Sequence, residues 1–105
     1  MSTEQQELLR AKFNMETSRI EWKELQRFFA NGAAIEVCNK LDLVEVALQM
    51  HADNKMQFEQ WLTDGLIGKV KDERAAAWLA ADTEVWAVVV SPWVLVQEIR
   101  DKTEH

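Results

Sequence analysis

The sequence predicts an α+β fold in which a small sheet of about three strands, near residues 33–39, 66–70 and 84–98, packs against four or five helices. The strongest observation is the stretch 83–98, whose apolar residues are nearly all β-branched or aromatic and therefore favour a pleated, buried strand. The alternation of residues in 33–39 is also typical of a strand. Between these stretches, polar capping sequences precede segments with the apolar spacing of helices.

Two helices are expected before residue 33. The first covers residues 3–15, because apolar side chains recur there at helical spacing. The second begins at the sequence SRIE, residues 18–21, which has the Ser-x-x-Glu pattern of a capping box. It ends at Asn31-Gly32, because both residues tolerate the left-handed conformation that closes a helix. The expected buried faces carry Leu8, Ala11 and Met15, flanked by Leu9 and Phe13, in the first helix and Trp22, Leu25, Phe28 and Phe29 in the second.

The strand at 33–39 is expected to bury one face, with Ile35 and Val37 on one side and Glu36 on the other. Asp42 then opens a helix as its N-cap, with Glu45 in the third position of a capping box. Asn54, followed three residues later by Gln57, opens a short helix that Gly65 closes. The expected inner faces carry Leu43, Val46, Ala47 and Met50 in the first of these helices and Phe58, Trp61 and Leu62 in the second.

The last third of the chain is expected to hold two strands separated by a helix. Residues 66–70 form the first strand, and Asp72 caps a helix over 73–81 whose inner face carries Ala75, Trp78 and Leu79. This helix allows a right-handed parallel crossover between the two strands. Val88-Val89-Val90 does not alternate in polarity, which predicts that both faces of the central strand are covered.

The proline in the final stretch divides it into two parts. Pro92 cannot donate a hydrogen bond to a neighbouring strand, so it marks a bulge, a bend or a strand end. The chain is expected to resume as a strand from Trp93, because Trp and Val dominate there. Ser91 as an N-cap, with Pro92 in the first helical position, would instead begin a helix over residues 92–98.

The composition indicates a single globular domain over residues 1–105, with 48% hydrophobic and 29% charged residues. The formal net charge of -6 repels phosphate backbones, so nucleic acid is not expected as a partner. No apolar stretch is long enough to span a membrane, and residues 1–10 lack the apolar core of a secretory signal. A cytoplasmic protein without a membrane partner is therefore expected.

The sequence predicts no catalytic residue, no cofactor and no metal site. Cys38 is the single cysteine, which rules out an internal disulfide, and it would need a base beside it to act as a nucleophile. His51 has no second histidine at ligand spacing and is interpreted as a residue at the edge of a helix. Glu36 is interpreted as solvated, although it would need a partner if buried. An enzyme is therefore not favoured.

The five tryptophans are the least ordinary feature of the composition. Trp22, Trp61 and Trp78 fit the apolar stripes of helices, which favours a place in the core. Trp86 and Trp93 lie on a strand pair or at its bend, where they could also wall a pocket or a surface for self-association.

Three segments of the chain carry a resemblance to a known family. They are LRAKFN-x-ET-x-RI-x-W-x-EL at residues 9–25, LDLVEVA at 41–47 and WAVVV-x-PWVLVQ at 86–97. With these segments the chain resembles a small family of uncharacterised bacterial proteins, catalogued as domain of unknown function 2288. The resemblance implies a cytoplasmic bacterial protein that stands alone as a domain. It implies no activity, cofactor or catalytic residue.

The function favoured by the sequence is a non-enzymatic, cytoplasmic protein-interaction module that binds a protein partner or associates with itself as a homodimer. The negative charge, the surplus of tryptophan and the lack of a catalytic constellation support it. The alternative is a small-ligand-binding domain with a pocket walled by Trp22, Trp86 and Trp93. Glu24 or Gln97 would then be the polar group of the pocket. Packing alone explains the residue types at 93–98 least well, so the functional surface is expected there.

Overall fold

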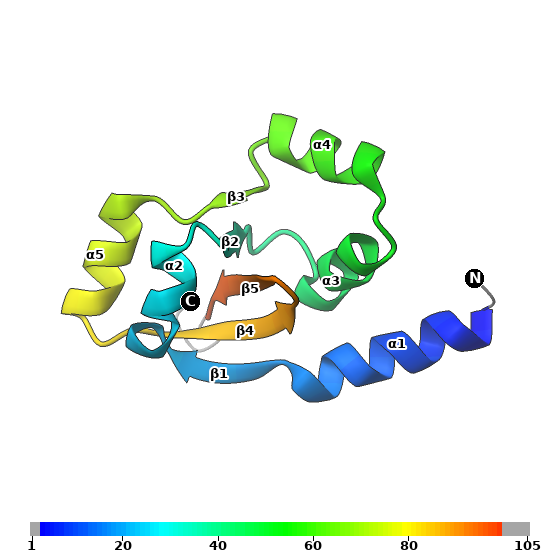
Figure 1. Ribbon diagram of the computed structural model, residues 1–105, viewed down its shortest axis with the longest axis horizontal. Helices are drawn as coiled ribbons and strands as arrows, with labels where there is room; N and C mark the ends of the chain where they lie inside the picture. Colours follow the sequence, from blue (N-terminus) through cyan, green and yellow to red (C-terminus); the bar gives the residue numbers. More distant parts are fainter. Residues whose placement is uncertain (1–2, 100–105) are drawn as a thin grey trace, which may run out of the picture.

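A five-stranded mixed sheet forms the centre of the protein, as Figure 1 shows. The computed structural model describes residues 3–99. Strand β5 is parallel to β2, and the other neighbouring pairs are antiparallel. The order across the sheet is β1-β4-β5-β2-β3. The strands are β1 (Ser18–Glu21), β2 (Ala34–Val37), β3 (Ile67–Lys69), β4 (Glu84–Val90) and β5 (Trp93–Glu98).

Helices cover both faces of the sheet, and each face has its own hydrophobic core. One core lies under α1, α3 and α4, and the other lies under α5, α2 and the 3-10 helix η1. Helix α1 extends away from the sheet at its N-terminal end (Figure 1). The helices are α1 (Thr3–Glu16), η1 (Trp22–Leu25), α2 (Gln26–Ala30), α3 (Leu43–His51), α4 (Lys55–Thr63) and α5 (Asp72–Ala80).

The stretch that dominates the sequence forms the β4–β5 hairpin at the middle of the sheet. Val85 and Ala87 are buried in one core, whereas Val88 and Val90 are buried in the other, so each face of β4 contributes to a core. The coverage is less complete than expected, because Val89 is 50% exposed. The hairpin turns at Ser91-Pro92, whose peptide bond is cis. Residues 93–98 form a strand, which confirms the favoured prediction over the helix alternative.

The α+β class is confirmed, but the sheet is larger than the predicted three strands. The three predicted stretches are strands, with the last one divided into β4 and β5. The prediction of a helix beginning at residues 18–21 was wrong, because these residues form β1. They pair with Glu84 to Ala87 of β4, and the free edge of that strand overrides the local capping pattern. The helical part begins only at Trp22 and is a 3-10 turn followed by the five-residue α2.

The helix α5 joins β3 to β4, and these two strands run in the same direction within the sheet, as the possible parallel crossover requires, but they are not neighbours. Strand β3 lies at an edge of the sheet and pairs only with β2, in antiparallel orientation. The neighbouring strands that run parallel are β2 and β5. Strands β5 and β2 lie between β3 and β4, because the β4–β5 hairpin enters the sheet between β1 and β2.

The expected caps are confirmed at Asp42, whose side chain accepts from the N–H of Val44 over 2.9 Å, and at Asn54, which accepts from Gln57 over 3.2 Å. Asp72 is not a cap, because it is already the first residue of α5. Glu45 does not complete a capping box, because its carboxylate pairs with Arg10 of α1 instead.

The expected inner faces of three helices need correction. Helix α1 buries Phe13 and half-buries Leu9, whereas Leu8 and Met15 are 71% and 85% exposed. The helix packs mainly against α3 and touches the sheet at β4, so only a narrow stripe of it is buried. Leu62 of α4 and Leu79 of α5 are likewise exposed, at 50% and 46%.

Candidate functional site

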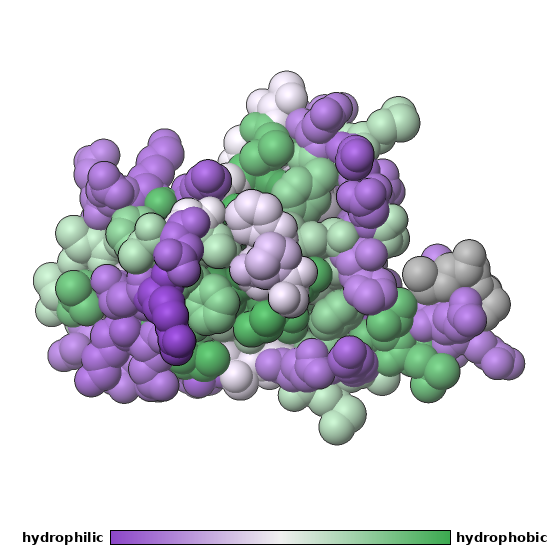
Figure 2. All heavy atoms as spheres, in the orientation of Figure 1, coloured by the Kyte–Doolittle hydropathy of each residue, from purple (hydrophilic) through white to green (hydrophobic). Residues whose placement is uncertain are grey.

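A cleft of about 380 Å³ opens between the turn that joins α3 to α4 and the sheet; it is here called the Trp93 cleft. Its floor is apolar and its rim carries a small number of polar side chains. The space-filling view in Figure 2 shows apolar surface below α4, between more hydrophilic groups on either side. The lining residues are Ile35, Met50, Phe58, Leu62 and Trp93 on the floor and Gln49, Asp53, Asn54, Lys55, Gly68 and Lys69 at the rim.

The sheet register places Lys69 and Trp93 on opposite sides of β2. Ile35 of β2 lies opposite Lys69 of the edge strand β3. On the other side of β2, the N–H of Val94 donates to the carbonyl oxygen of Ala33 over 2.9 Å, which sets Trp93 beside the start of β2. Lys69 and Trp93 are 24 positions apart in the sequence, and only this pairing brings them to one site.

The α3–α4 side of the cleft is held by polar contacts. Asp53 has a positive φ of 57°, which turns the chain sharply between the two helices. The amide of Asn54 caps α4 and also donates to the side-chain oxygen of Gln49 over 2.7 Å. The rim on this side is therefore fixed by the same residues that start the helix.

A second hollow of about 580 Å³ adjoins the cleft and shares Trp93 and Lys69 with it; it is here called the Arg27 hollow. Arg27 and Phe28 of α2 form its other side. The ammonium nitrogen of Lys69 lies 3.5 Å from the position that a Cβ at Gly32 would take, which is an ordinary van der Waals distance, and Gly32 is favoured there by its positive φ of 71°. The described lining contains no carboxylate and consists of Arg27, Phe28, Asn31, Gly32, Ala33, Lys69, Pro92 and Trp93.

The structure separates the three tryptophans that the sequence singled out as pocket walls. Trp22 is fully buried in the core on the other face of the sheet, with its ring centroid 5.1 Å from that of Trp78. Trp86 is 36% exposed near the start of β4, where the guanidinium carbon of Arg19 lies 5.9 Å from its ring centroid. A pocket walled by all three is therefore not formed, and Trp93 alone of the three lines the cleft.

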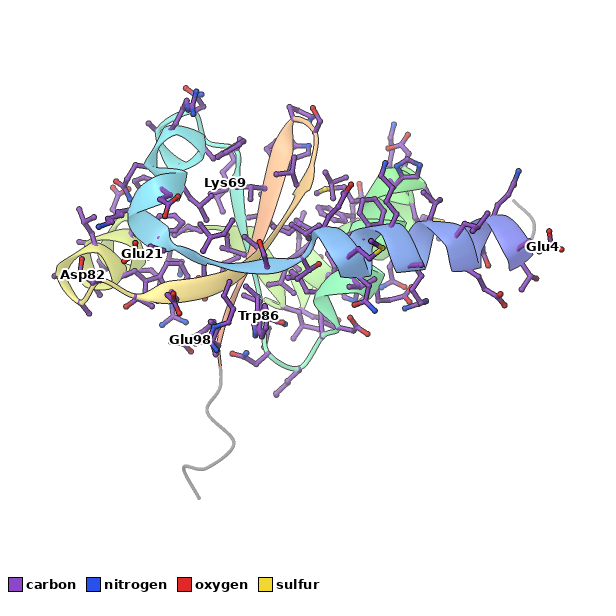
Figure 3. The ribbon with its side chains drawn as sticks, turned by 90° about the horizontal axis from the view of Figure 1, so that it is seen from below. Glu4, Glu21, Lys69, Asp82, Trp86 and Glu98 are labelled. Atoms are coloured by element: carbon purple, nitrogen blue, oxygen red, sulfur yellow. The ribbon has the colours of Figure 1, made fainter. Side chains whose placement is uncertain are left out.

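The predicted polar groups are placed elsewhere as well. Glu24 is exposed on η1 and lines neither hollow. The side chain of Gln97 donates to the carbonyl oxygens of Cys38 and Leu41, so its amide is engaged within the fold. In Figure 3, Lys69 and the pair Trp86 and Glu98 lie at opposite ends of the strands.

Glu36 has a partner that the sequence pattern did not indicate. Arg74 of α5 donates to one carboxylate oxygen of Glu36 from Nε over 3.1 Å and from Nη2 over 2.8 Å. The same guanidinium lies 3.5 Å from Glu98 and 5.0 Å from the ring centroid of Trp78. Because Arg74 links α5 to β2 and β5, we interpret this cluster as structural.

The side chains that complete the candidate site could not be found from the sequence. Phe58 was expected only as a core residue, Arg27 has no motif around it, and Lys69 belongs to a short positive cluster with Lys71 and Arg74 that Asp72 and Glu73 dilute. Between residues 3 and 99, no group of three or more His, Cys, Asp or Glu residues is placed to hold a metal ion. Within the same part of the chain, every helix is too short or too polar to cross a membrane.

Comparison with known proteins agrees with the fold. The structure is similar to the NMR solution structure of PA1075 from Pseudomonas aeruginosa, with a TM-score of 0.78 and 45% sequence identity. The match covers 97% of this chain and 94% of that chain. No curated protein matches the sequence. Residues 8–98 match the family described as protein of unknown function DUF2288, and the chain belongs to that family.

Proposed function

We propose that this protein is a non-enzymatic binding protein that takes a small, largely apolar ligand into the Trp93 cleft. The observation that carries this proposal is the combination of an apolar floor with a polar rim in one cleft of about 380 Å³. Sites for small molecules have volumes of roughly 300–1,000 Å³, are mainly apolar and carry a few polar groups that orient the ligand. The cleft has these properties on a scaffold held by the sheet.

Burial of the side chains on the floor of the cleft favours the binding of an apolar ligand. Phe58 and Trp93 are only half-buried, and Leu62 is 50% exposed, so their surfaces are partly in contact with water. Each 100 Å² of apolar surface that a ligand removes from water contributes about 2.5 kcal/mol. An apolar ligand that covers these three side chains therefore needs few polar contacts.

The proposal is tested by titrating the full chain with decanol, a neutral apolar probe, while NMR follows the indole N–H signals. We expect the Trp93 signal to shift on addition of decanol and the Trp86 signal to stay in place. Leu62→Glu puts a charge on the floor of the cleft and should abolish the shift. Leu79→Glu is the matched control, because Leu79 has a similar exposure of 46% on α5. An unmoved Trp93 signal, or an equal response from the Leu62→Glu variant, would reject the cleft as the binding site.

A second candidate function is protein interaction through α1, as a homodimer or with another protein. Leu8 and Met15 are seven residues apart and therefore on the same side of the helix, where they are 71% and 85% exposed. Exposed apolar residues of this kind mark interaction surfaces when they lie together. Helix α1 also reaches beyond the sheet, where a second chain could approach it (Figure 1).

Size-exclusion chromatography with light scattering tests this second candidate. We expect a dimer for the wild-type chain and a monomer for the Leu8→Glu/Met15→Glu variant, with Leu79→Glu again as the control. Circular dichroism should give the same helix content for all three chains. A wild-type chain that stays monomeric at all accessible concentrations would exclude the homodimer.

We also propose a cytoplasmic location in a bacterium. The similarity to a protein from Pseudomonas aeruginosa supports the bacterial source. A single cysteine, which is half-buried, fits a reducing compartment. Fractionation of the native cells, with detection of the protein by antibody, tests the location.

A further inference from the structure

We propose that the ligand of the Trp93 cleft is a free small molecule that joins an apolar body to a carboxylate, and that Arg27 and Lys69 bind this carboxylate in the Arg27 hollow. This inference rests on the proposed function, because it needs the apolar body to occupy the cleft. It adds the chemical class of the ligand and the two residues that select it.

The arrangement of the two hollows supports a ligand with two unlike ends. They share Trp93 and Lys69, so one molecule can fill the apolar cleft and continue past the indole into the Arg27 hollow. The cleft offers Phe58 and Leu62 to an apolar body, whereas the hollow offers the cations of Arg27 and Lys69. A single amphiphilic molecule matches both surfaces at once.

The charges around the hollow favour an anion. The chain carries 18 acidic and 12 basic residues, yet no acidic residue belongs to the described lining of the hollow. Within residues 3–99, Arg27 and Lys69 form no ion pair, whereas other cations such as Arg10 and Arg74 do. Two cations that face one hollow without a carboxylate are complementary to a bound anion.

The rim at the far end of the cleft does not offer the same attraction. Asp53 and Lys55 lie there together, on the turn into α4, and their opposite charges offset each other. A carboxylate therefore gains most at the Arg27 hollow, where both charges are positive. The ligand therefore lies with its carboxylate in the Arg27 hollow and its apolar body in the Trp93 cleft.

Three probes that share a ten-carbon chain test the proposal: decanoate, decanol and decylamine, each below its micelle-forming concentration. Calorimetry and the indole N–H signal of Trp93 report binding to the full chain. We expect decanoate to bind more tightly than decanol, and decanol more tightly than decylamine. Arg27→Gln or Lys69→Gln should each weaken decanoate binding about tenfold, which corresponds to one charge-assisted hydrogen bond. The double variant should bind decanoate and decanol equally.

Lys71→Gln is the matched control, because Lys71 is exposed close to Lys69 but does not line either hollow. It should leave decanoate binding unchanged, and thermal melts should show that all variants are folded. If decanoate and decanol bind the wild-type chain equally, the anionic selection is wrong and the apolar binding function stands. If neither probe binds, both proposals are wrong. If the wild-type chain sediments with phosphatidylglycerol vesicles and the double variant does not, the partner of Arg27 and Lys69 is a lipid surface, and the proposal of a free ligand is wrong.

Discussion

The side-chain amide of Gln97 donates a hydrogen bond to the carbonyl oxygen of Leu41 over 2.7 Å. The same nitrogen donates to the carbonyl oxygen of Cys38 over 3.0 Å. In return, the amide of Asn39 donates to the carbonyl oxygen of Glu98 over 2.6 Å. The end of β5 and the loop between β2 and α3 therefore hold each other, and Gln97 has a structural function rather than the binding function that its place in the sequence suggested.

Replacement of Gln97 should destabilise this loop. Gln97→Met keeps the length of the side chain but leaves two backbone carbonyls without their donor, and we expect a loss of about 1–3 kcal/mol in the free energy of unfolding. Urea denaturation measures the loss. Gln60→Met is a matched control, because Gln60 is exposed and, among residues 3–99, its side chain donates only to Asp64. Equal stability of the two variants would mean that the loop does not depend on Gln97.

Trp22 should contribute far more to stability than Trp86. Trp22 is fully buried and packs edge-on against Phe29 and Trp78. Trp22→Ala leaves a large cavity and should cost about 3–5 kcal/mol. Trp86 is 36% exposed. Its truncation to Ala should cost about 1–2 kcal/mol, mostly through lost packing against β1 and Arg19. Guanidinium denaturation compares the two variants, and similar losses would contradict the assigned burial.

The contact between Glu36 and Arg74 should appear as a coupling energy in a double-mutant cycle. Their side chains are 26% and 40% exposed, so solvent screens part of the attraction. From Glu36→Gln, Arg74→Met and the double variant we expect a coupling of about 0.5–1.5 kcal/mol. High salt should reduce it, because the Debye length falls to about 3 Å at 1 M. Additive losses in the cycle would show that the pair contributes nothing beyond its packing on Trp78.

Stability should depend on pH through Glu45. Hydrogen bonds from Gln49 and then Arg10 hold the pKa of Glu45 below its ordinary value. A lowered pKa in the folded state stabilises the protein above the ordinary pKa of glutamate, and this contribution is lost as the pH falls through the lowered pKa. The difference in unfolding free energy between the wild type and Glu45→Gln should therefore be largest near neutral pH and fade in acid.

Urea denaturation over a pH series measures this difference. Glu59→Gln is the control, because Glu59 is exposed on α4 and makes no ion pair among residues 3–99. Its difference from the wild type should stay small at every pH. A Glu45→Gln difference that does not change with pH would contradict the role given to Gln49 and Arg10.

Local sequence patterns were sufficient for the α+β class and for most of the elements. The β-branched and aromatic residues from Val85 to Val90 favour a strand, and they form β4, although Trp86 and Val89 are partly exposed. The caps at Asp42 and Asn54 also act within a few residues, so they could be read from the order of the residues alone.

The same local reasoning failed where two patterns fit one segment. Residues 18–21 have both the spacing of a capping box and the length of a short strand. Their choice depends on β4, whose free edge offers backbone hydrogen bonds more than 60 positions further along the chain. Glu36 is a similar case, because its partner Arg74 is 38 residues away.

For the candidate site, the sequence singled out residues 93–98, but only Trp93 of these lines the cleft, because Val94 to Val96 are fully buried in the two cores. It also grouped Trp93 with Trp22 and Trp86, which the two faces of the sheet and the lengths of β4 and β5 keep apart. Phe58, Lys69 and Arg27 join Trp93 instead, through the packing of α4, the register of β3 on β2 and the position of α2. Residue type and periodicity indicate whether a side chain is buried or exposed and in which kind of element it lies. Long-range strand pairing determines which residues become its neighbours.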